Sequence, residues 1–362
     1  MVKVSIIMPV YNVEAYIRKS LDSVVNQTLK DIEAICVDDC SPDGSGRILD
    51  EYAAKDKRIR VFHLEKNGGP GVARNFALGK AKGEYIMFLD PDDWYELNAC
   101  ELAYNQISTN QNDMVMFAYN QHDESTGQVE AVYSILKPLW SMRGRGQIVL
   151  DEFDRDFISK CYTWVYIYRF QFLKENNIRY AETMNFEDHL FLLKSFMYAK
   201  TVSISDKPLY NYLIRRVSLT RSVGNKNKEM LPVKKSILED LEKTGNRGNI
   251  RKAIISHTIK NSLYWFNTIY PFLNILSKRR FYNDIRELFL SLDVKYVSKE
   301  IKKRLNEKIY KQYKFFCKYS YWHYIFSVVL GKFVQNLIAL KDSADKKHKI
   351  FSFLGIKVKV RK

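Results

Sequence analysis

The sequence has 362 residues, 46% of them hydrophobic and 27% charged, so the chain can bury a sizeable core and is not a disordered protein. This length favours two domains, or one domain with a long extension. The formal net charge of +17 predicts attraction to something anionic, such as nucleic acid, an anionic membrane face or a phosphorylated substrate. Charge alone does not choose among these partners.

The cysteines and the N-terminus bear on the cellular compartment. The cysteines are scattered, with no CxxC pair and no zinc-like grouping with histidine, which indicates reduced thiols in a cytosolic protein. They are Cys36, Cys40, Cys100, Cys161 and Cys317. The apolar run at the N-terminus breaks at Pro9 and is too short for a signal peptide. We expect a first strand there, and a protein that is not secreted by that route.

Strand and helix patterns alternate along the first hundred residues. The strand patterns are VKVSIIMPV, IEAICVDD, IRVFHLE and EYIMFLD, and helical patterns lie between them at 14–26, 45–55 and 72–80. Such alternation predicts an α/β fold, in which right-handed crossovers build a mostly parallel sheet with helices on both faces.

Polar clusters follow each of these strands. They are PVYN at 9–12, DDCSPDGSG at 38–46, NGGPG at 67–71 and DPDD at 90–93. In open α/β sheets the ligand lies outside the carboxyl ends of the strands, so these clusters can converge on one cleft. The glycines do not follow the G-x-G-x-x-G spacing, and DGSGR lacks the P-loop lysine, which argues against dinucleotide and Walker-type phosphate binding.

The acidic cluster at 90–93 is the most informative. Asp90 and Asp92 stand two residues apart, on the same side of an extended segment, and can share one hard divalent cation. Mg²⁺ and Mn²⁺ prefer oxygen ligands and are commonly completed by substrate phosphates and water. Solvation of a loop is the plainer explanation of such a pair. The metal hypothesis predicts a phosphorylated donor held through the cation.

The series PVYN, VDDCSPDGS, NGGPGVARN and FLDPDDW, in this order and spacing, resembles the family 2 glycosyltransferases with the GT-A fold. These are inverting enzymes that use nucleotide sugars. The resemblance is specific over the first hundred residues and continues with weaker motifs to residue 222. It implies a GT-A (Rossmann-like nucleotide-diphospho-sugar transferase) domain with a mostly helical C-terminal extension.

The resemblance assigns roles to the acidic cluster and to a basic residue. Asp92 matches the aspartate that ligates the metal, Mn²⁺ or Mg²⁺. Asp90 matches the aspartate that faces the ribose or the water shell of the metal, so both are candidates for the metal site and Asp90 also for donor binding. Arg74 in GVARN matches a basic residue near the donor, although an arginine in the first turn of a helix can simply be solvated.

The same resemblance places the nucleotide base near the first two strands. Pro9, Tyr11 and Glu14 lie in the segment that resembles the base pocket. Asp39 matches the aspartate that contacts the uracil side of the donor. Asp38 shares that role or orders the loop, and the sequence leaves both interpretations open.

Inverting transfer also needs a carboxylate that takes the proton of the acceptor hydroxyl. The segment 184–196 predicts a helix that begins at Glu187 and Asp188, where stabilisation of the helix terminus is the plainer role for both. The resemblance to the E-D-x-x-F pattern of the family implies that Asp188 is the general base and that Glu187 binds acceptor hydroxyls. His189 is expected to be a neighbour of the site, not a ligand.

Two later segments resemble acceptor and diphosphate elements. Trp164 is a candidate for stacking on an acceptor sugar, and a core position is at least as well supported by its apolar neighbours. In LYNYLIRRVSLTRS, Leu213 stands where the family often has an arginine. The remaining candidates for diphosphate binding are Arg215, Arg216 and Ser218.

The chain changes character after about residue 225. Helical patterns rich in lysine, tyrosine and phenylalanine follow, with no catalytic motif. The segment 321–340 is near the length of a membrane span but is interrupted by polar residues and predicts an amphipathic helix. The tail at 346–362 alternates like a strand with one basic face. This end either docks on anionic lipid or packs as a helical subdomain on the catalytic domain.

We therefore expect a catalytic domain at 1–224, with a nucleotide-sugar half at 1–100 and an acceptor half at 101–224, and a basic helical region at 225–362. The expected reaction moves a hexose or N-acetylhexosamine from a UDP-sugar to a hydroxyl of a growing surface glycan, such as a capsule, lipopolysaccharide or teichoic-type polymer. The expected location is the cytoplasm, with the inner face of the cell membrane as a surface for peripheral binding. The oligomeric state, homo-oligomer included, is left open.

Two rival functions are weighed against this one. A sugar-phosphate nucleotidyltransferase is expected to carry a glycine-rich signature near its first strand, which PVYNVEAYIRKS lacks. A non-catalytic basic protein that binds nucleic acid needs basic and aromatic side chains on its binding face. The acidic clusters at the expected cleft argue against it.

Overall fold

The computed structural model describes residues 1–133, 148–149, 158, 162–183, 185–215, 226–245, 248–296, 305–322, 324, 339–342, 348–353 and 356–361. In the N-terminal part the strands are β1 (Val4–Val10), β2 (Ile32–Asp38), β3 (Ile59–His63), β4 (Tyr85–Phe88), β5 (Trp94–Tyr95), β6 (Met114–Asp123), β7 (Val129–Val132), β8 (Ile148–Val149), β9 (Tyr166–Arg169) and β10 (Thr201–Ile214). The helices there are α1 (Ile17–Val25), α2 (Ser45–Lys55), α3 (Pro70–Lys80), α4 (Ala99–Asn110), α5 (Phe170–Glu175) and α6 (Glu187–Tyr198).

The first hundred residues form the predicted alternation of strands and helices. β1 pairs in parallel with both β2 and β4, and β2 pairs in parallel with β3. The chain winds outward from β1 to β3 and then returns to β4 on the other side of β1. This reversal makes the point between β1 and β4 the place where an open α/β sheet leaves a crevice at the carboxyl ends of its strands.

The second half of the sheet is not parallel throughout. The strand order is β3-β2-β1-β4-β9-β6-β10-β5, and β9 runs antiparallel to both of its neighbours, β4 and β6. β10 is parallel to β6 and antiparallel to β5. The sheet is therefore mixed, and β9, which directly follows the 3-10 helix Thr163–Val165, enters between two strands from the opposite end.

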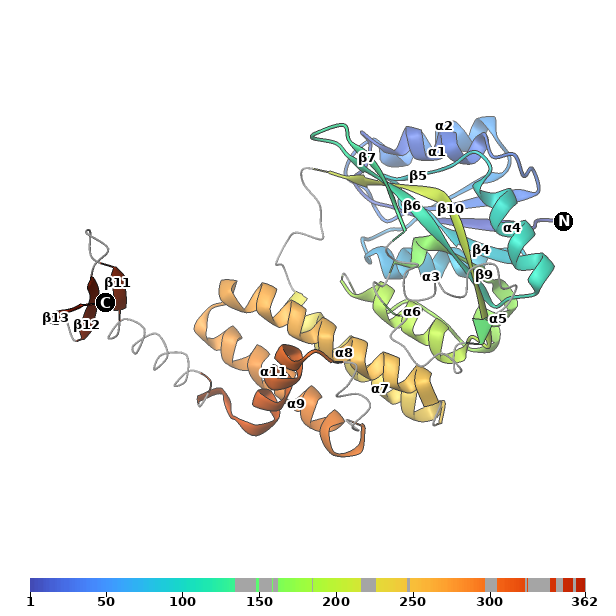
Figure 1. Cartoon of the computed structure of the whole chain (residues 1–362). Helices are drawn as coiled ribbons and strands as arrows, with labels where there is room; N and C mark the ends of the chain where they lie inside the picture. Colours follow the sequence, from blue (N-terminus) through green and yellow to red (C-terminus); the bar gives the residue numbers. More distant parts are fainter. Residues whose placement is uncertain are drawn as a thin grey trace.

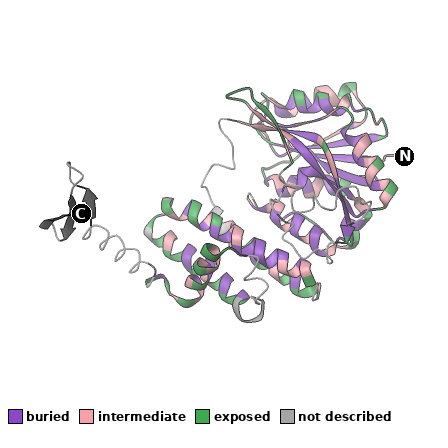
Figure 2. Cartoon of the chain, in the orientation of Figure 1, coloured by how far each residue is buried: buried purple, intermediate pink, exposed green. Residues whose placement is uncertain are grey.

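Helices cover both faces of the sheet, as Figure 1 shows, with α1 and α2 on one side and α3 and α6 on the other. Every residue of β1 and of β2 is buried. Continuous burial of this kind is expected for parallel strands that are covered on both faces. In Figure 2 the buried residues accordingly fill the sheet, while exposed residues lie on the outer helix surfaces.

The helical region beside this domain consists of α7 (Lys226–Lys243), α8 (Gly248–Ile269), α9 (Ile275–Tyr296) and α11 (Glu307–Lys318). An aromatic core holds these helices together, and it includes Phe266, Tyr282 and Phe316. The rings of Tyr282 and Phe316 stack with centroids 4.6 Å apart. Both α7 and α8 contact α6, so the region packs directly on the N-terminal domain. The expected boundary at residue 224 lies outside the described residues.

The C-terminal end differs in part from the prediction. A three-stranded antiparallel sheet forms from β11 (Ala339–Asp342), β12 (His348–Phe353) and β13 (Ile356–Arg361). β13 confirms the predicted strand in the basic tail. The predicted helix at 321–340 is wrong at its end, because residues 339–340 belong to β11, and 325–338 lie outside the described residues. Among the described helices, none has the length and apolar composition to cross a bilayer.

Candidate functional site

Arg74 joins two of the sequence motifs. Its side chain projects from the first turns of α3, is only 8% exposed, and donates to Asp90 Oδ1 at 2.8 Å and to Glu187 Oε1 at 2.9 Å. Asp90 follows β4, whereas Glu187 is the first residue of α6. Burial opposes the charge of the guanidinium, but Asp90, Tyr180 and Glu187 together raise the pKa of Arg74. Arg74 is therefore an internal link of the site, not a solvated side chain.

Asp92 lies beside a second arginine. Its Oδ2 is 2.8 Å from Nε of Arg215, just beyond the end of β10, and both side chains are less than 20% exposed. The Arg215 guanidinium also lies over the ring of Tyr16, 5.0 Å from its centroid. Burial, followed by the nearby charge of Asp90, raises the pKa of Asp92. Of the three candidates for diphosphate binding, Arg215 thus reaches the acidic cluster, while Arg216 and Ser218 lie outside the described residues.

Asp93 has a structural role that the sequence does not reveal. The residue is 1% exposed, and its carboxylate accepts hydrogen bonds from the Tyr210 hydroxyl at 2.7 Å and from the Leu213 backbone N–H at 2.7 Å. The Tyr210 oxygen in turn accepts the backbone N–H of Asp90 at 3.1 Å. Burial, with the charge of Asp92 next, raises the pKa of Asp93. Asp93 therefore ties the acidic loop to β10 and sets the position of Asp90 and Asp92.

The arrangement of Asp90 and Asp92 is compatible with a divalent cation. The two carboxylates lie close enough for Asp90 to raise the pKa of Asp92, a repulsion that a cation between them would relieve. Over the part of the chain that the structure describes, no group of three or more His, Cys, Asp and Glu side chains could hold a metal ion. Two carboxylates of this kind could hold a cation whose remaining ligands are substrate phosphates and water.

Asp39 and Asp38 order the loops at the end of β2. The Asp39 carboxylate accepts the backbone N–H groups of Gly68 and Gly69, each at 2.8 Å, and burial raises its pKa. Gly69 has φ 90°, a conformation that only glycine adopts without strain, and it immediately precedes α3. Asp38 accepts the Ser41 N–H at 3.0 Å and contacts His63 Nδ1 at 2.9 Å. Asp38 thus has the loop-ordering contacts that the sequence allowed.

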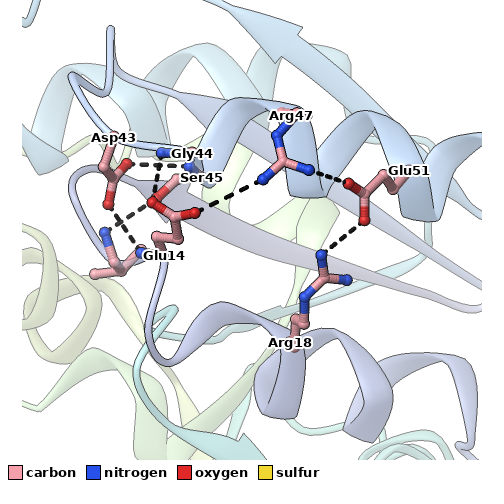
Figure 3. Close-up of polar contacts among 8 residues, drawn as sticks. Glu14, Arg18, Asp43, Gly44, Ser45, Arg47 and Glu51 are labelled. Carbon is pink, nitrogen blue, oxygen red and sulfur yellow. Dashed lines mark hydrogen bonds and ion pairs between the residues drawn. The ribbon is translucent and has the colours of Figure 1, made fainter.

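At the expected base pocket, a polar network joins the loops after β1 and β2 (Figure 3). Glu14 accepts the backbone N–H of Gly44 at 2.9 Å, and its own N–H donates to Asp43 at 2.9 Å. Arg47 lies 3.7 Å from Glu14 and pairs with Glu51 at 2.6 Å. The network fixes one loop against the other. Pro9 is buried in β1 and Tyr11 is 43% exposed, so of these two only Tyr11 offers its side chain to a ligand.

The candidate base lies at the start of α6, as predicted. Phe186, immediately before the helix, has φ 65°, a strained value for a bulky residue. Burial and the charge of Glu187 raise the pKa of Asp188 well above its usual range, although Arg74 and Lys234 oppose the shift. Burial likewise raises the pKa of Glu187. Proton uptake by Asp188 is thus easier than for a carboxylate in water.

The approach of α3 to this helix depends on Gly71. A Cβ at this position would overlap the carbonyl oxygen of Ala181 and would lie 3.1 Å from the Cβ of Glu187. Glycine therefore lets the segment before α6 pass directly over the start of α3. This close packing brings Glu187 within reach of Arg74.

Trp164 lies in the core. It is 6% exposed and is surrounded by tyrosines, stacking on Tyr210 at 4.3 Å, Tyr162 at 4.9 Å and Tyr212 at 5.4 Å between ring centroids. A sugar cannot stack on a ring that tyrosines already cover. The acceptor role expected for Trp164 is therefore not supported, and the core alternative describes this residue.

Comparison with known proteins agrees with this geometry. The family model for glycosyl transferase family 2 matches residues 5–197, which contain both strand-end acidic clusters and the start of α6. The chain belongs to this family. It is thereby placed among enzymes that transfer glycosyl groups, and the expected family and α/β fold are confirmed.

Individual relatives match over part of the chain. An uncharacterized glycosyltransferase, EpsJ, of Bacillus subtilis is 36% identical over 246 residues, which cover 66% of this chain and 67% of that one. The poly(ribitol-phosphate) beta-N-acetylglucosaminyltransferase TarS of Staphylococcus aureus is 31% identical over 222 residues, 60% of this chain and 36% of its own length. The chain thus spans two thirds of the first relative and about a third of the second.

A solved structure resembles the whole chain. The crystal structure of residues 1–349 of S. aureus TarS in complex with UDP-GlcNAc aligns with a TM-score of 0.76 and covers 99% of both chains, at 22% identity. At that identity the likeness establishes the fold, and it extends past the sheet into the helical region. The GT-A fold with a helical C-terminal extension is therefore confirmed.

Proposed function

We propose that this protein is an inverting glycosyltransferase that moves a hexose or N-acetylhexosamine from a UDP-sugar to a hydroxyl of a growing surface glycan. The observation that carries the proposal is the double contact of Arg74 with Asp90 and Glu187. This contact joins the acidic loop, where a phosphorylated donor is expected, to the helix that begins with the candidate base. Donor and acceptor chemistry are thus held in one rigid frame.

The donor side of the proposal rests on the strand-end loops. Tyr11 is 43% exposed directly after β1, and Val10 before it accepts the backbone N–H of Asp39, so two of the residues proposed to contact the nucleotide base lie at the ends of neighbouring strands. A family member with the same fold, TarS, has been crystallised with UDP-GlcNAc and with UDP. That fold likeness and the matching loops support a uridine nucleotide, and UDP-GlcNAc is the first donor to test.

In the proposed reaction, Asp188 accepts the proton of the attacking acceptor hydroxyl while the bond between the sugar and the UDP diphosphate breaks. The raised pKa of Asp188 suits this role, because a general base works best when its pKa lies near the operating pH. Glu187, held by Arg74, is placed to orient an acceptor hydroxyl. A single displacement of this kind inverts the configuration at the anomeric carbon.

Asp92 and Asp90 would hold Mn²⁺ or Mg²⁺, which when bound stabilises the negative charge of the departing diphosphate. Arg215 already lies beside Asp92, so its guanidinium is placed to contribute a further positive charge on that side of the donor. The chain therefore supplies two carboxylates that could bind a metal ion, and it supplies the positively charged side chain of Arg215 beside them.

The acceptor is proposed to be an anionic glycan or polyol phosphate. The net charge of +17 favours a polyanionic acceptor, which it would attract before a hydroxyl reaches the site. A relative acts on poly(ribitol-phosphate), according to its name, which agrees with this choice. Attraction to the anionic inner face of the cell membrane follows from the same charge, so an acceptor linked to lipid is also consistent with it.

Calorimetric titration with a panel of nucleotide sugars tests the donor site. We expect one UDP-sugar to bind with Mn²⁺ present and to lose most of its affinity with chelator, and we expect Asp92→Asn to behave like the chelated protein. If donor binding were unaffected by chelator and by Asp92→Asn, the donor site would not use a cation. Analysis of the released product separates the rival chemistry, because a transferase releases UDP whereas a nucleotidyltransferase forms or consumes UTP and pyrophosphate.

A further inference from the structure

The helical region contacts the segment that carries the candidate base on both sides of that base. Three residues close to Asp188 in the chain contact α7 and α8 through a hydrogen bond, an aromatic contact and a contact to a lysine. The pairs are Asn185 with Glu229 at 2.6 Å, Phe186 with Trp265 at 5.3 Å between ring centroids, and His189 with Lys234 at 3.1 Å. The side chain of Glu187, in contrast, faces Arg74 of the sheet domain.

Lys234 is the unusual member of this set. It is fully buried, at 0% exposure, and Nζ lies 3.1 Å from Nδ1 of His189. A lysine ammonium only donates hydrogen bonds, so Nδ1 of His189 accepts and the ring proton lies on Nε2. Complete burial of a lysine is costly unless its environment holds it. No pattern in the sequence distinguishes Lys234 from its neighbour Lys235, which lies on the surface.

The titratable groups around Asp188 come from α6 itself and from α3, α7 and α8, which pack against it. Arg74 of α3 and Lys234 of α7 favour the ionised carboxylate, while burial and Glu187 favour the protonated form. The imidazoles of His189 and of His257, on α8, are kept neutral because burial and Lys234 lower the pKa of each. Lys234 is thus the cation that α7 adds near Asp188.

We propose that Lys234 is a positioning residue for the general base, Asp188. In this proposal α7, which carries Lys234, belongs to the active site. The proposal rests on the proposed function of Asp188. In it, Lys234 fixes the His189 ring and through it the first turn of α6, which carries Asp188. The charge of Lys234 also favours the ionised form of Asp188.

A purely structural role for Lys234 is the alternative, and the same interface supplies the control. Farther along the two helices, Lys194 of α6 pairs with Asp240 of α7 at 3.0 Å, with both side chains largely buried. Successive contacts join residue 185 to 229, residue 189 to 234 and residue 194 to 240. The residue numbers increase in the same direction along both helices, so α6 and α7 run in parallel. Lys194→Met removes a buried cation from this interface without touching the turn that carries Asp188.

The experiment compares Lys234→Met, Lys194→Met and the unchanged full-length protein. The titration midpoint of Asp188 is measured by ¹³C NMR of protein with labelled aspartate, with Asp188→Asn to assign the signal. Transfer from UDP-GlcNAc is followed against pH, and UDP binding by calorimetry. Lys234→Gln serves as a second neutral variant, because its amide can still donate to His189 if the methionine variant does not fold.

We expect the neutral Lys234 variants to raise the Asp188 midpoint, because a cation that favours the carboxylate is gone. Transfer should then fall about tenfold at the acidic end of the profile and be largely retained on the alkaline plateau, with UDP binding unchanged. Lys194→Met should lower stability and leave the midpoint in place. An unmoved midpoint in a folded Lys234 variant, or an equal movement in Lys194→Met, would overturn the proposal.

The NMR titration needs neither donor nor acceptor, which separates the two proposals. A protein that transfers no sugar from any donor, yet shows the expected midpoint shift, would refute the proposed function alone. A protein that transfers sugar and shows no shift would refute the role of Lys234 alone.

Discussion

Arg215 and Asp92 form an ion pair in which Nε of the arginine lies 2.8 Å from Oδ2 of the aspartate. Asp92 is the residue expected to ligate the metal, so this carboxylate already has a cation beside it before any donor arrives. The pairing stabilises a buried carboxylate whose pKa is raised. A divalent cation would have to share Asp92 with Arg215 or displace it.

Replacement of Arg215 tests this competition. We expect Arg215→Gln to bind Mn²⁺ more tightly in the absence of donor, because the carboxylate no longer has an internal partner. UDP should bind more weakly, because a positive charge near the diphosphate is lost. Electron paramagnetic resonance of free Mn²⁺ measures the first effect and calorimetry the second. Unchanged Mn²⁺ affinity would show that the ion pair and the metal use different oxygens.

Arg74 is expected to be essential to both stability and transfer. Arg74→Met leaves Asp90 and Glu187 without their shared buried cation, and loss of one partner from a buried charge pair costs about 3–5 kcal/mol. Arg74→Lys keeps the charge but cannot span two carboxylates. Its stability and transfer rate should therefore lie between those of the unchanged protein and those of Arg74→Met. Urea unfolding and transfer assays measure both effects. Wild-type stability in Arg74→Met would contradict the role of the bridge.

Asp188→Asn separates binding from chemistry. The asparagine keeps the shape of the side chain but cannot take a proton, so transfer should fall about 10²–10⁴-fold while UDP binding persists. Glu187→Gln is the matched comparison at the neighbouring position, and we expect it to raise the KM for acceptor more than it lowers kcat. Full transfer by Asp188→Asn would assign the base to another residue.

Gly71 and Gly79 make a matched pair within α3. A methyl group at Gly71 would overlap the carbonyl oxygen of Ala181, whereas a Cβ at Gly79 meets nothing within 4 Å. Gly71→Ala should therefore lower the melting temperature and the transfer rate by forcing α3 away from Glu187. Gly79→Ala should be neutral or more stable by about 0.5–1 kcal/mol, since alanine favours the helix. Equal effects of the two changes would show that the close approach is unimportant.

Acid should weaken the packing of the helical region. Burial lowers the pKa of His257 from 6.5 to about 3, so the unfolded chain takes up this proton first as pH falls. The free energy of unfolding therefore decreases between pH 6.5 and about 3, and for this residue the loss at pH 5 is about 2 kcal/mol. Urea unfolding of the protein and of His257→Gln at pH 7 and pH 5 isolates this share, which should vanish in the variant. An equal loss in both would assign the acid sensitivity to other groups.

Much of the first hundred residues could be predicted from the sequence because each strand and helix there has its own periodicity. The predicted helix at 45–55 coincides with α2, and the others differ from the structure only at their ends. The entry of β9 between β4 and β6 could not be predicted, because a four-residue strand carries no signal of its direction. Strand β11 was not predicted, because the helical pattern of the segment before it was expected to continue to residue 340.

The candidate site could be predicted only in part from the sequence. The sequence pattern placed Asp90 and Asp92 after a strand and Asp188 at the start of a helix, which the structure confirms, whereas their roles follow from the resemblance to the family and stay predictions. The Arg74 bridge to Glu187 crosses 113 residues of chain, and no local pattern could indicate it. For Trp164 the sequence left a sugar-stacking role and a core position open, and its burial among tyrosines in the structure favours the core position.

The contacts between α6 and α7 have a consequence for how the N-terminal domain and the helical region are inherited. The region matched by the family model ends at residue 197, yet the neighbours that hold the first turn of α6 come from 229 to 265. A helical region exchanged with that of a relative would replace Lys234 and its companions together. Under the role proposed for Lys234, the start of α6 and the helical region have to be inherited as one unit.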